Sequence, residues 1–169
     1  MIIDQGFPII KYKSWQTPLD WGHFHGEEFR SSIKELAQIR KNLMLNKNPK
    51  LKGNLDNLAN QQWDITKEFD YDQYLELKGI AEGSNLSYQD IIILNNYTDF
   101  RDIELPEEGC STLHFKGKDA NSAGQTWDMH SSAKKFMTLI EVPETESSPS
   151  ALILSLVGCT GLMGINSHG

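Results

Sequence analysis

"PEEGCSTLHF" (residues 106–115) lies where the hydrophobic pattern of the chain changes from helical to strand-like. Apolar residues before it recur at three- and four-residue spacing, whereas short segments rich in Thr, Ile, Val, Leu and aromatic residues follow it. Gly109 and Cys110 stand at this boundary, and the cysteine opens the first expected strand. We therefore predict an α+β fold in which a helical segment, residues 1–109, precedes a strand-rich segment, residues 110–169.

Helical signals before the boundary are both periodic and local. Three stretches place their apolar residues on one face of a helix. Ser87 followed by Asp90 resembles a capping box, with Asp in place of the usual Glu, and predicts that the third helix begins at Tyr88. The expected helices cover residues 26–46, 71–82 and 88–97, after a short extended segment within residues 1–15.

Strand signals after the boundary alternate with turn signals. "KGKDANSAG" (residues 116–124) and "PETESSPS" (residues 143–150) are expected to be turns between antiparallel strands. The closing "GCTGLMGINSHG" (residues 158–169) has glycines at three-residue spacing but lacks the lysine of a P-loop, which favours turns over nucleotide binding. The expected strands are Ser111–Phe115, Thr126–His130, Phe136–Val142 and Ala151–Gly158.

Composition excludes several function classes. The chain has a net charge of −7, carried mostly by residues 1–109, so we expect no basic patch for nucleic acid or an anionic membrane. The N-terminus lacks the features of a signal peptide, and no apolar run is long enough for a membrane span. Two cysteines without paired spacing favour a reducing compartment, so we expect a cytoplasmic protein.

Cys110 gains a specific chemistry if the bond that joins it to Gly109 is cut. Cleavage would free an α-amino group with a pKa of about 8, close to the ordinary thiol value of about 8.5. One residue would then carry both a nucleophile and its base. Gly109 suits such a cut because a residue without Cβ tolerates the strained backbone that brings the thiol to its carbonyl. The residue pattern alone also allows Cys110 to be an ordinary half-buried strand residue.

Four blocks follow one another along the chain: "ELKGIAEGSNLSYQDIIILNNYTDF", "EEGCSTLHF", "GQTWDMH" and "GLMGINSHG". Their order and separation resemble the acyl-coenzyme A:6-aminopenicillanate acyltransferase family of autoproteolytic N-terminal-nucleophile (Ntn) hydrolases. The resemblance implies a helical leader, a Gly-Cys processing site and an αββα sandwich whose first strand begins with the nucleophile. In that family an Asn beyond the last block supplies the oxyanion site, and Asn166 inside the block does not replace it. We therefore expect an incomplete sandwich at residue 169.

The resemblance assigns roles one position at a time. Cys110 matches the nucleophile, and Gly109 matches the residue before the cut. Asp128 matches an acidic residue beside the new amino terminus, where a carboxylate would hold the amine through a charge-assisted hydrogen bond. The alternative for Asp128 is a turn former at a strand end. Thr126 stands where the family more often has Asn, so one hydrogen-bonding amide is missing near the site.

Three more residues are candidates for the substrate pocket: Thr112, Trp127 and His130. Strand alternation places Thr112 on the face of the nucleophile, and it places His130 on the face of Asp128. Trp127 belongs to the same block and lies next to Asp128. His114 is a weaker catalytic candidate, because four residues of extended strand separate it from the thiol by about 13 Å.

The sequence predicts no metal site. His23 and His25 lack further ligands at suitable spacing and are interpreted as surface residues where a helix begins. Cys159, Met129 and Met163 are interpreted as core residues. The expected reaction needs no cofactor, and acyl-coenzyme A is a candidate substrate.

The first functional hypothesis is a precursor that cleaves itself before Cys110 and then hydrolyses or transfers acyl groups through an acyl-Cys110 intermediate. Its expected partners are a small-molecule amide or thioester and its own processed segments. The alternative is a catalytically incomplete fragment that acts as a binding or oligomerising module. A cysteine hydrolase of the bile-salt or penicillin-V amidase type shares the chemistry, but the roughly hundred-residue leader disfavours it.

Overall fold

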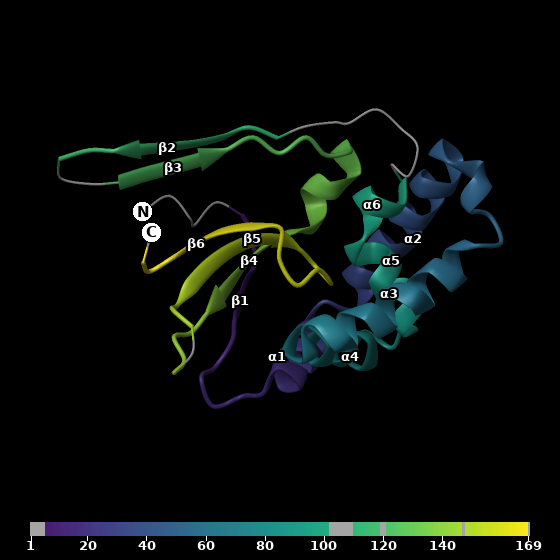
Figure 1. Cartoon of the computed structure of the whole chain (residues 1–169), viewed down its shortest axis with the longest axis horizontal. Coiled ribbons are helices and arrows are strands. Elements are labelled where there is room, and N and C mark those ends of the chain that lie inside the picture. The colour runs from purple at the N-terminus through teal and green to yellow at the C-terminus, as the bar shows by residue number, and fades with distance from the viewer. Residues whose placement is uncertain (1–5, 102–109, 119–120, 147, 169) are drawn as a thin grey trace.

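The computed structural model describes residues 6–101, 110–118, 121–146 and 148–168. It has an α+β fold in which the helices gather on one side of a four-stranded sheet, while a separate hairpin, β2–β3, extends beside it (Figure 1). The helices are α1 (Pro18–Glu28), α2 (Arg30–Lys47), α3 (Leu55–Phe69), α4 (Tyr71–Ser84), α5 (Tyr88–Asn95) and α6 (Tyr97–Arg101), with 3₁₀ turns η1 (Pro49–Leu51) and η2 (Ser131–Phe136). The strands are β1 (Ile9–Lys11), β2 (Thr112–Lys116), β3 (Asn121–Gln125), β4 (Met137–Val142), β5 (Ala151–Leu156) and β6 (Met163–Asn166).

Local signals predicted the later helices well. The stretch 71–82 is helix α4, and α5 begins at the predicted residue because the Ser87 hydroxyl accepts from the backbone N–H of Asp90 at 3.1 Å. The helix predicted over residues 26–46 is divided at Phe29 between the end of α1 and the whole of α2. Helix α3, the first eight residues of α1 and the part of α6 after Tyr97 were not predicted.

Helices α1 and α4 cross where the glycines of one helix face the glycines of the other. Gly22 and Gly26 of α1 face Gly79 and Gly83 of α4, so each helix carries glycines four residues apart on the contact. A Cβ atom added to Gly22 would lie 1.9 Å from the backbone oxygen of Glu76, which no side chain can tolerate. The two backbones therefore touch, as small residues at i and i+4 allow.

The four-stranded sheet has the order β1-β4-β5-β6. Antiparallel pairing joins β4 to β5, as the sequence predicts, and it also joins β5 to β6. Strand β1 instead runs parallel to β4, with Ile9 opposite Leu139 and Ile10 opposite Ile140. Since β1 precedes the helices and β4 follows residue 110, the sheet is built from both predicted segments.

Three strand assignments need correction. The strand predicted over residues 126–130 is wrong, because these residues leave the hairpin and lead into η2. Residues 116–124, which were expected to be a turn, contain most of β3. Its Asn, Ser and Gly residues gain their strand conformation from pairing with β2. Strand β6, in the glycine-containing stretch expected as turns, was also not predicted.

The helices enclose the main hydrophobic core, and a smaller cluster of Ile10, Tyr12 and Ile140 lies between β1, β4 and α1. Cys159 is buried in the main core, and Met129 packs against it, as expected. No helix among the described residues combines the length and apolar character needed to cross a membrane.

Candidate functional site

Cys110 is an exposed free thiol two residues before the start of β2. Gly109, the predicted residue before the cut, lies outside the described residues. The backbone N–H of Ser111 donates to Thr126 Oγ1 at 2.9 Å, and the N–H of Thr126 donates to the Ser111 carbonyl at 2.9 Å. These bonds extend the β2–β3 pairing by one residue pair, so the thiol stands at the open end of the hairpin.

The register of the hairpin relates Cys110 to the "TWD" block. Because Ser111 lies opposite Thr126, Cys110 and Trp127 are the first residues beyond this last pair, and Asp128 follows Trp127 in the chain. Trp127 is half-buried and packs against the main core, whereas Asp128 is exposed. The fold therefore brings the predicted nucleophile and the predicted carboxylate to the same end of the hairpin.

Thr112 lies beside an apolar groove of about 400 Å³ between the hairpin and the four-stranded sheet. His114, on the same strand, lines this groove further along. Both residues are exposed, and the lining of the groove does not include Cys110. The groove walls on the sheet side are apolar, formed by residues that include Leu139, Leu152, Leu154, Met163 and Ile165.

His130 does not lie on a strand. It precedes η2, where its Nδ1 accepts from the backbone N–H of Ser132 at 3.3 Å and lies 2.9 Å from the Ser132 hydroxyl. The strand-alternation argument that placed it on the face of Asp128 is therefore wrong. His130 serves as the cap of a 3₁₀ turn.

His25 is fully buried, which corrects its interpretation as a surface residue. The backbone N–H of Gly158 donates to His25 Nε2 at 2.9 Å, so the ring hydrogen resides on Nδ1. Nδ1 lies 3.4 Å from the hydroxyl of Tyr12, which in turn donates to Glu76 Oε1 at 2.7 Å. A directional chain of hydrogen bonds thus joins the turn after β5 to a carboxylate on α4.

Burial shifts the pKa of each group in this chain of hydrogen bonds, His25, Tyr12 and Glu76, toward the value that favours its neutral form. It lowers the pKa of His25 to about 3. Burial likewise raises the pKa of Glu76 to about 7, where the Tyr12 hydrogen bond opposes the shift and the charge of Asp70 adds to it. The pKa of Tyr12 is raised well above its ordinary value, first by burial and then by Glu76. At neutral pH this chain of hydrogen bonds therefore contains the neutral imidazole of His25 and the carboxyl group of Glu76, which is close to its titration midpoint.

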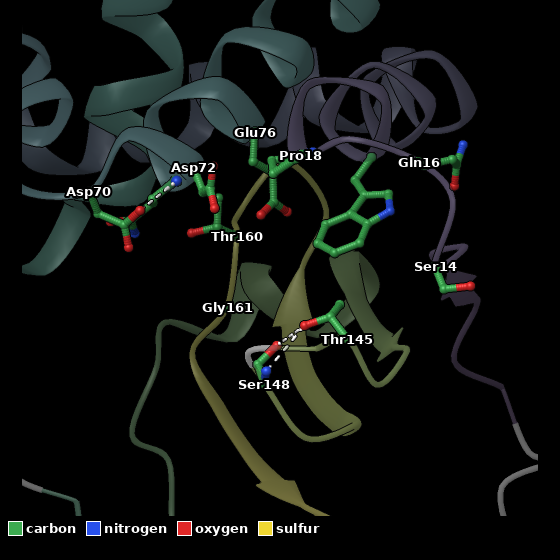
Figure 2. A pocket seen from close by; sticks show the side chains of 12 residues that line it. Ser14, Gln16, Pro18, Asp70, Asp72, Glu76, Thr145, Ser148, Thr160 and Gly161 are labelled. Carbon is green, nitrogen blue, oxygen red and sulfur yellow. Dashed lines mark hydrogen bonds between the residues drawn. The ribbon is translucent and has the colours of Figure 1, made fainter.

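Glu76 also lines a cleft of about 590 Å³ between the helices and the loops of the sheet (Figure 2). Asp70 and Asp72 lie on the helical wall with it, and Thr160 and Gly161 lie on the sheet side. The cleft is thus acidic on one wall. Its lining includes none of the residues predicted for catalysis.

Two more side chains, half-buried Asn95 and buried Arg40, attach the turn after β5 to the helices. Asn95 of α5 donates to the carbonyl of Gly158 at 2.9 Å and accepts from the N–H of Thr160 at 3.1 Å. Arg40 of α2 donates to Cys159 Sγ at 3.7 Å and stacks 4.8 Å from the ring centre of Tyr97. Sequence reasoning missed these anchors, because each joins residues more than fifty positions apart.

Within the part of the chain that the structure describes, no three His, Cys, Asp or Glu side chains are grouped closely enough to hold a metal ion.

The known proteins that resemble this chain include a distant relative. No family model matches the chain. The acyl-coenzyme A:6-aminopenicillanic-acid-acyltransferase 40 kDa form of Emericella nidulans is 25% identical to it over 154 residues, which are 90% of this chain and 43% of that protein. The chain therefore spans less than half the length of this curated relative. The relation supports the acyltransferase family loosely and acyl transfer at the family level, and it assigns no role to any residue.

Proposed function

We propose that the chain is part of a self-processing cysteine acyltransferase or amidohydrolase that is cut between Gly109 and Cys110. The observation that carries this proposal is the position of Cys110, an exposed free thiol at the open end of a hairpin, the same end at which the segment that contains Asp128 follows β3. The distant acyltransferase relative supports acyl transfer as the reaction class.

The processing step needs only the thiol and one water. Cys110 Sγ attacks the carbonyl carbon of residue 109, and the C–N bond breaks as the thiol proton passes to the departing amine. Water then hydrolyses the thioester, which restores the thiol and leaves a carboxylate on residue 109. The new α-amino group serves as the base for later reactions at the same thiol, since its pKa of about 8 lies near neutral pH.

Asp128 would hold the new amino group through a charge-assisted hydrogen bond. The acyl donor is an amide or thioester, with acyl-coenzyme A as a candidate, and the acyl-Cys110 intermediate is resolved by water or an amine. No cofactor takes part. We place the reaction in the cytoplasm, because both cysteines are free thiols.

The mass of the purified protein tests this function. We expect two pieces that begin at Met1 and Cys110 and whose masses add up to the precursor plus one water. Cys110→Ala should remain a single chain. Cys159→Ala, which removes a buried thiol outside the site, should be cut like the wild type. A wild-type chain that stays whole would overturn the proposal.

The hairpin supports a second candidate, a binding or oligomerising module. Leu113 and Phe115 of β2 are 72% and 65% exposed, which is unusual for two large apolar residues on one strand. This function requires no cleavage. Self-association in light scattering by an uncut chain, lost in Leu113→Ser, would favour it over the enzyme.

A further inference from the structure

The pairing of β2 with β3 ends in an irregular way at Thr126. The Thr126 N–H donates to the Ser111 carbonyl, as in a regular antiparallel pair. The return bond is different, because the Ser111 N–H donates to the Thr126 side-chain hydroxyl at 2.9 Å, where a regular pair would use the backbone carbonyl. The Thr126 side chain therefore supplies the acceptor for the last hydrogen bond between the two strands. The backbone can then turn away after Thr126.

This hydroxyl acts on the peptide group next to the thiol. The N–H of Ser111 belongs to the planar peptide unit whose other end is the Cα atom of Cys110. An acceptor that fixes this N–H therefore fixes the plane from which the Cys110 side chain and its amino nitrogen project. Ser111 and Thr126 are both exposed, so no surrounding packing orients that plane in their place.

Thr126 is followed in the chain by Trp127 and Asp128. Trp127 is half-buried against the main core, which attaches the "TWD" block to the rest of the molecule. Thr126 thus connects a fixed segment that carries Asp128 to a strand end that carries Cys110. Without its hydroxyl, the Ser111 N–H would lose its acceptor, and the strand end that carries Cys110 would be joined to this segment by one hydrogen bond fewer.

We infer that Thr126 is a positioning residue that holds the strand end carrying Cys110 against the segment that carries Asp128, for the reaction at the thiol. This inference rests on the proposed function. Thr126 touches none of the reacting atoms, and it acts through the Ser111 amide. The position requires a side-chain acceptor, which Ser and Asn also provide and Val does not.

The test measures the rate of cleavage before Cys110. The wild-type chain, Thr126→Val, Thr126→Ser and Thr126→Asn are made by timed cell-free synthesis, and the uncut fraction is followed by intact mass. We expect Thr126→Val to slow cleavage about fivefold, the effect of losing one neutral hydrogen bond. Thr126→Ser should stay within about twofold of the wild type, and Thr126→Asn should recover most of the rate. Ser122→Ala, which removes an exposed hydroxyl further along β3, is the matched control and should cleave normally.

Three results would overturn the inference. Equal cleavage rates in Thr126→Val and the wild type would contradict the inference about Thr126 and leave the proposed function intact. Slow cleavage in both Thr126→Val and Thr126→Ser would also overturn it, since the hydroxyl would not be the operative group. A wild-type chain that is never cut would remove the proposed function and this inference together. Melting temperatures of all variants identify any loss of folding, and rescue by Ser excludes a merely structural effect.

Discussion

At the scale of single residues, Glu76 is a group whose charge changes near neutral pH. Its ordinary pKa of 4.5 is raised to about 7, first because partial burial in the wall of the cleft disfavours the charged carboxylate. A folded state that binds a proton more tightly than the unfolded state gains stability at low pH and loses it as pH rises through 7. His25 has the opposite sign, because its lowered pKa makes the folded state lose stability as pH falls from 6.5 toward 3.

Glu76→Gln should remove the loss of stability at higher pH. The amide oxygen of Gln can still accept from Tyr12 but cannot ionise. Between pH 5 and pH 8 we expect the free energy of unfolding of the wild type to fall relative to the variant by about 1–3 kcal/mol. Urea unfolding at a series of pH values measures this difference. Glu82→Gln, on an exposed part of the same helix, is the control, and parallel wild-type and Glu76→Gln curves would contradict the prediction.

Residues with local motifs could be found from the sequence, and residues defined by packing could not. Cys110 and Asp128 were singled out by short blocks, and the hairpin brings them to one end. The role of His25 depends on the crossing of α1 and α4, which no short block encodes. Its position between Gly22 and Gly26 was a usable signal, because this glycine spacing recurs at Gly79 and Gly83.

At the scale of elements, the α1–α4 crossing should be sensitive to a single methyl group. A Cβ atom at Gly79 would lie 2.2 Å from the backbone oxygen of Leu19, so the helices must move apart. Although Ala is the better helix former by about 1 kcal/mol, we expect Gly79→Ala to lower the free energy of unfolding by about 1–3 kcal/mol. Denaturant unfolding measures the sign directly.

Gly124→Ala provides the control for this substitution. An added Cβ atom at Gly124 meets no other atom within 4 Å, so we expect a change of no more than about 0.5 kcal/mol. A Gly79→Ala chain that is more stable than the wild type would show that helix propensity, and not the crossing, dominates.

Secondary structure was predictable where periodicity and caps agree. Helices α4 and α5 and strands β4 and β5 follow such signals closely. The prediction of a strand over residues 126–130 was wrong for a physical reason. The Thr126 side chain accepts the hydrogen bond from Ser111, and the backbone after Thr126 no longer pairs with β2. Strand β3 has weak intrinsic signals and exists because β2 pairs with it.

At the scale of the whole molecule, the two sides of the proposed cut are joined by contacts independent of the chain between them. Strand β1 pairs in parallel with β4, and His25 and Asn95 bond the turn after β5. These bonds are buried or half-buried, so breaking them leaves polar groups without partners at about 1–3 kcal/mol each. We therefore expect the processed segments to remain associated, as the two parts of one folded unit.

A chain cut by an added protease tests this association without relying on self-cleavage. A protease site inserted between residues 105 and 106 of Cys110→Ala allows cleavage on demand. We expect the two pieces to elute together in size-exclusion chromatography at micromolar concentration. Asn95→Ala should make them separate at lower denaturant concentration, because it leaves the Gly158 carbonyl and the Thr160 N–H unpaired. Asn96→Ala is the matched control, since its amide bonds its own helix at Ile92. Pieces that separate in buffer, or equal effects of the two substitutions, would show that β1 and these anchors do not hold the segments together.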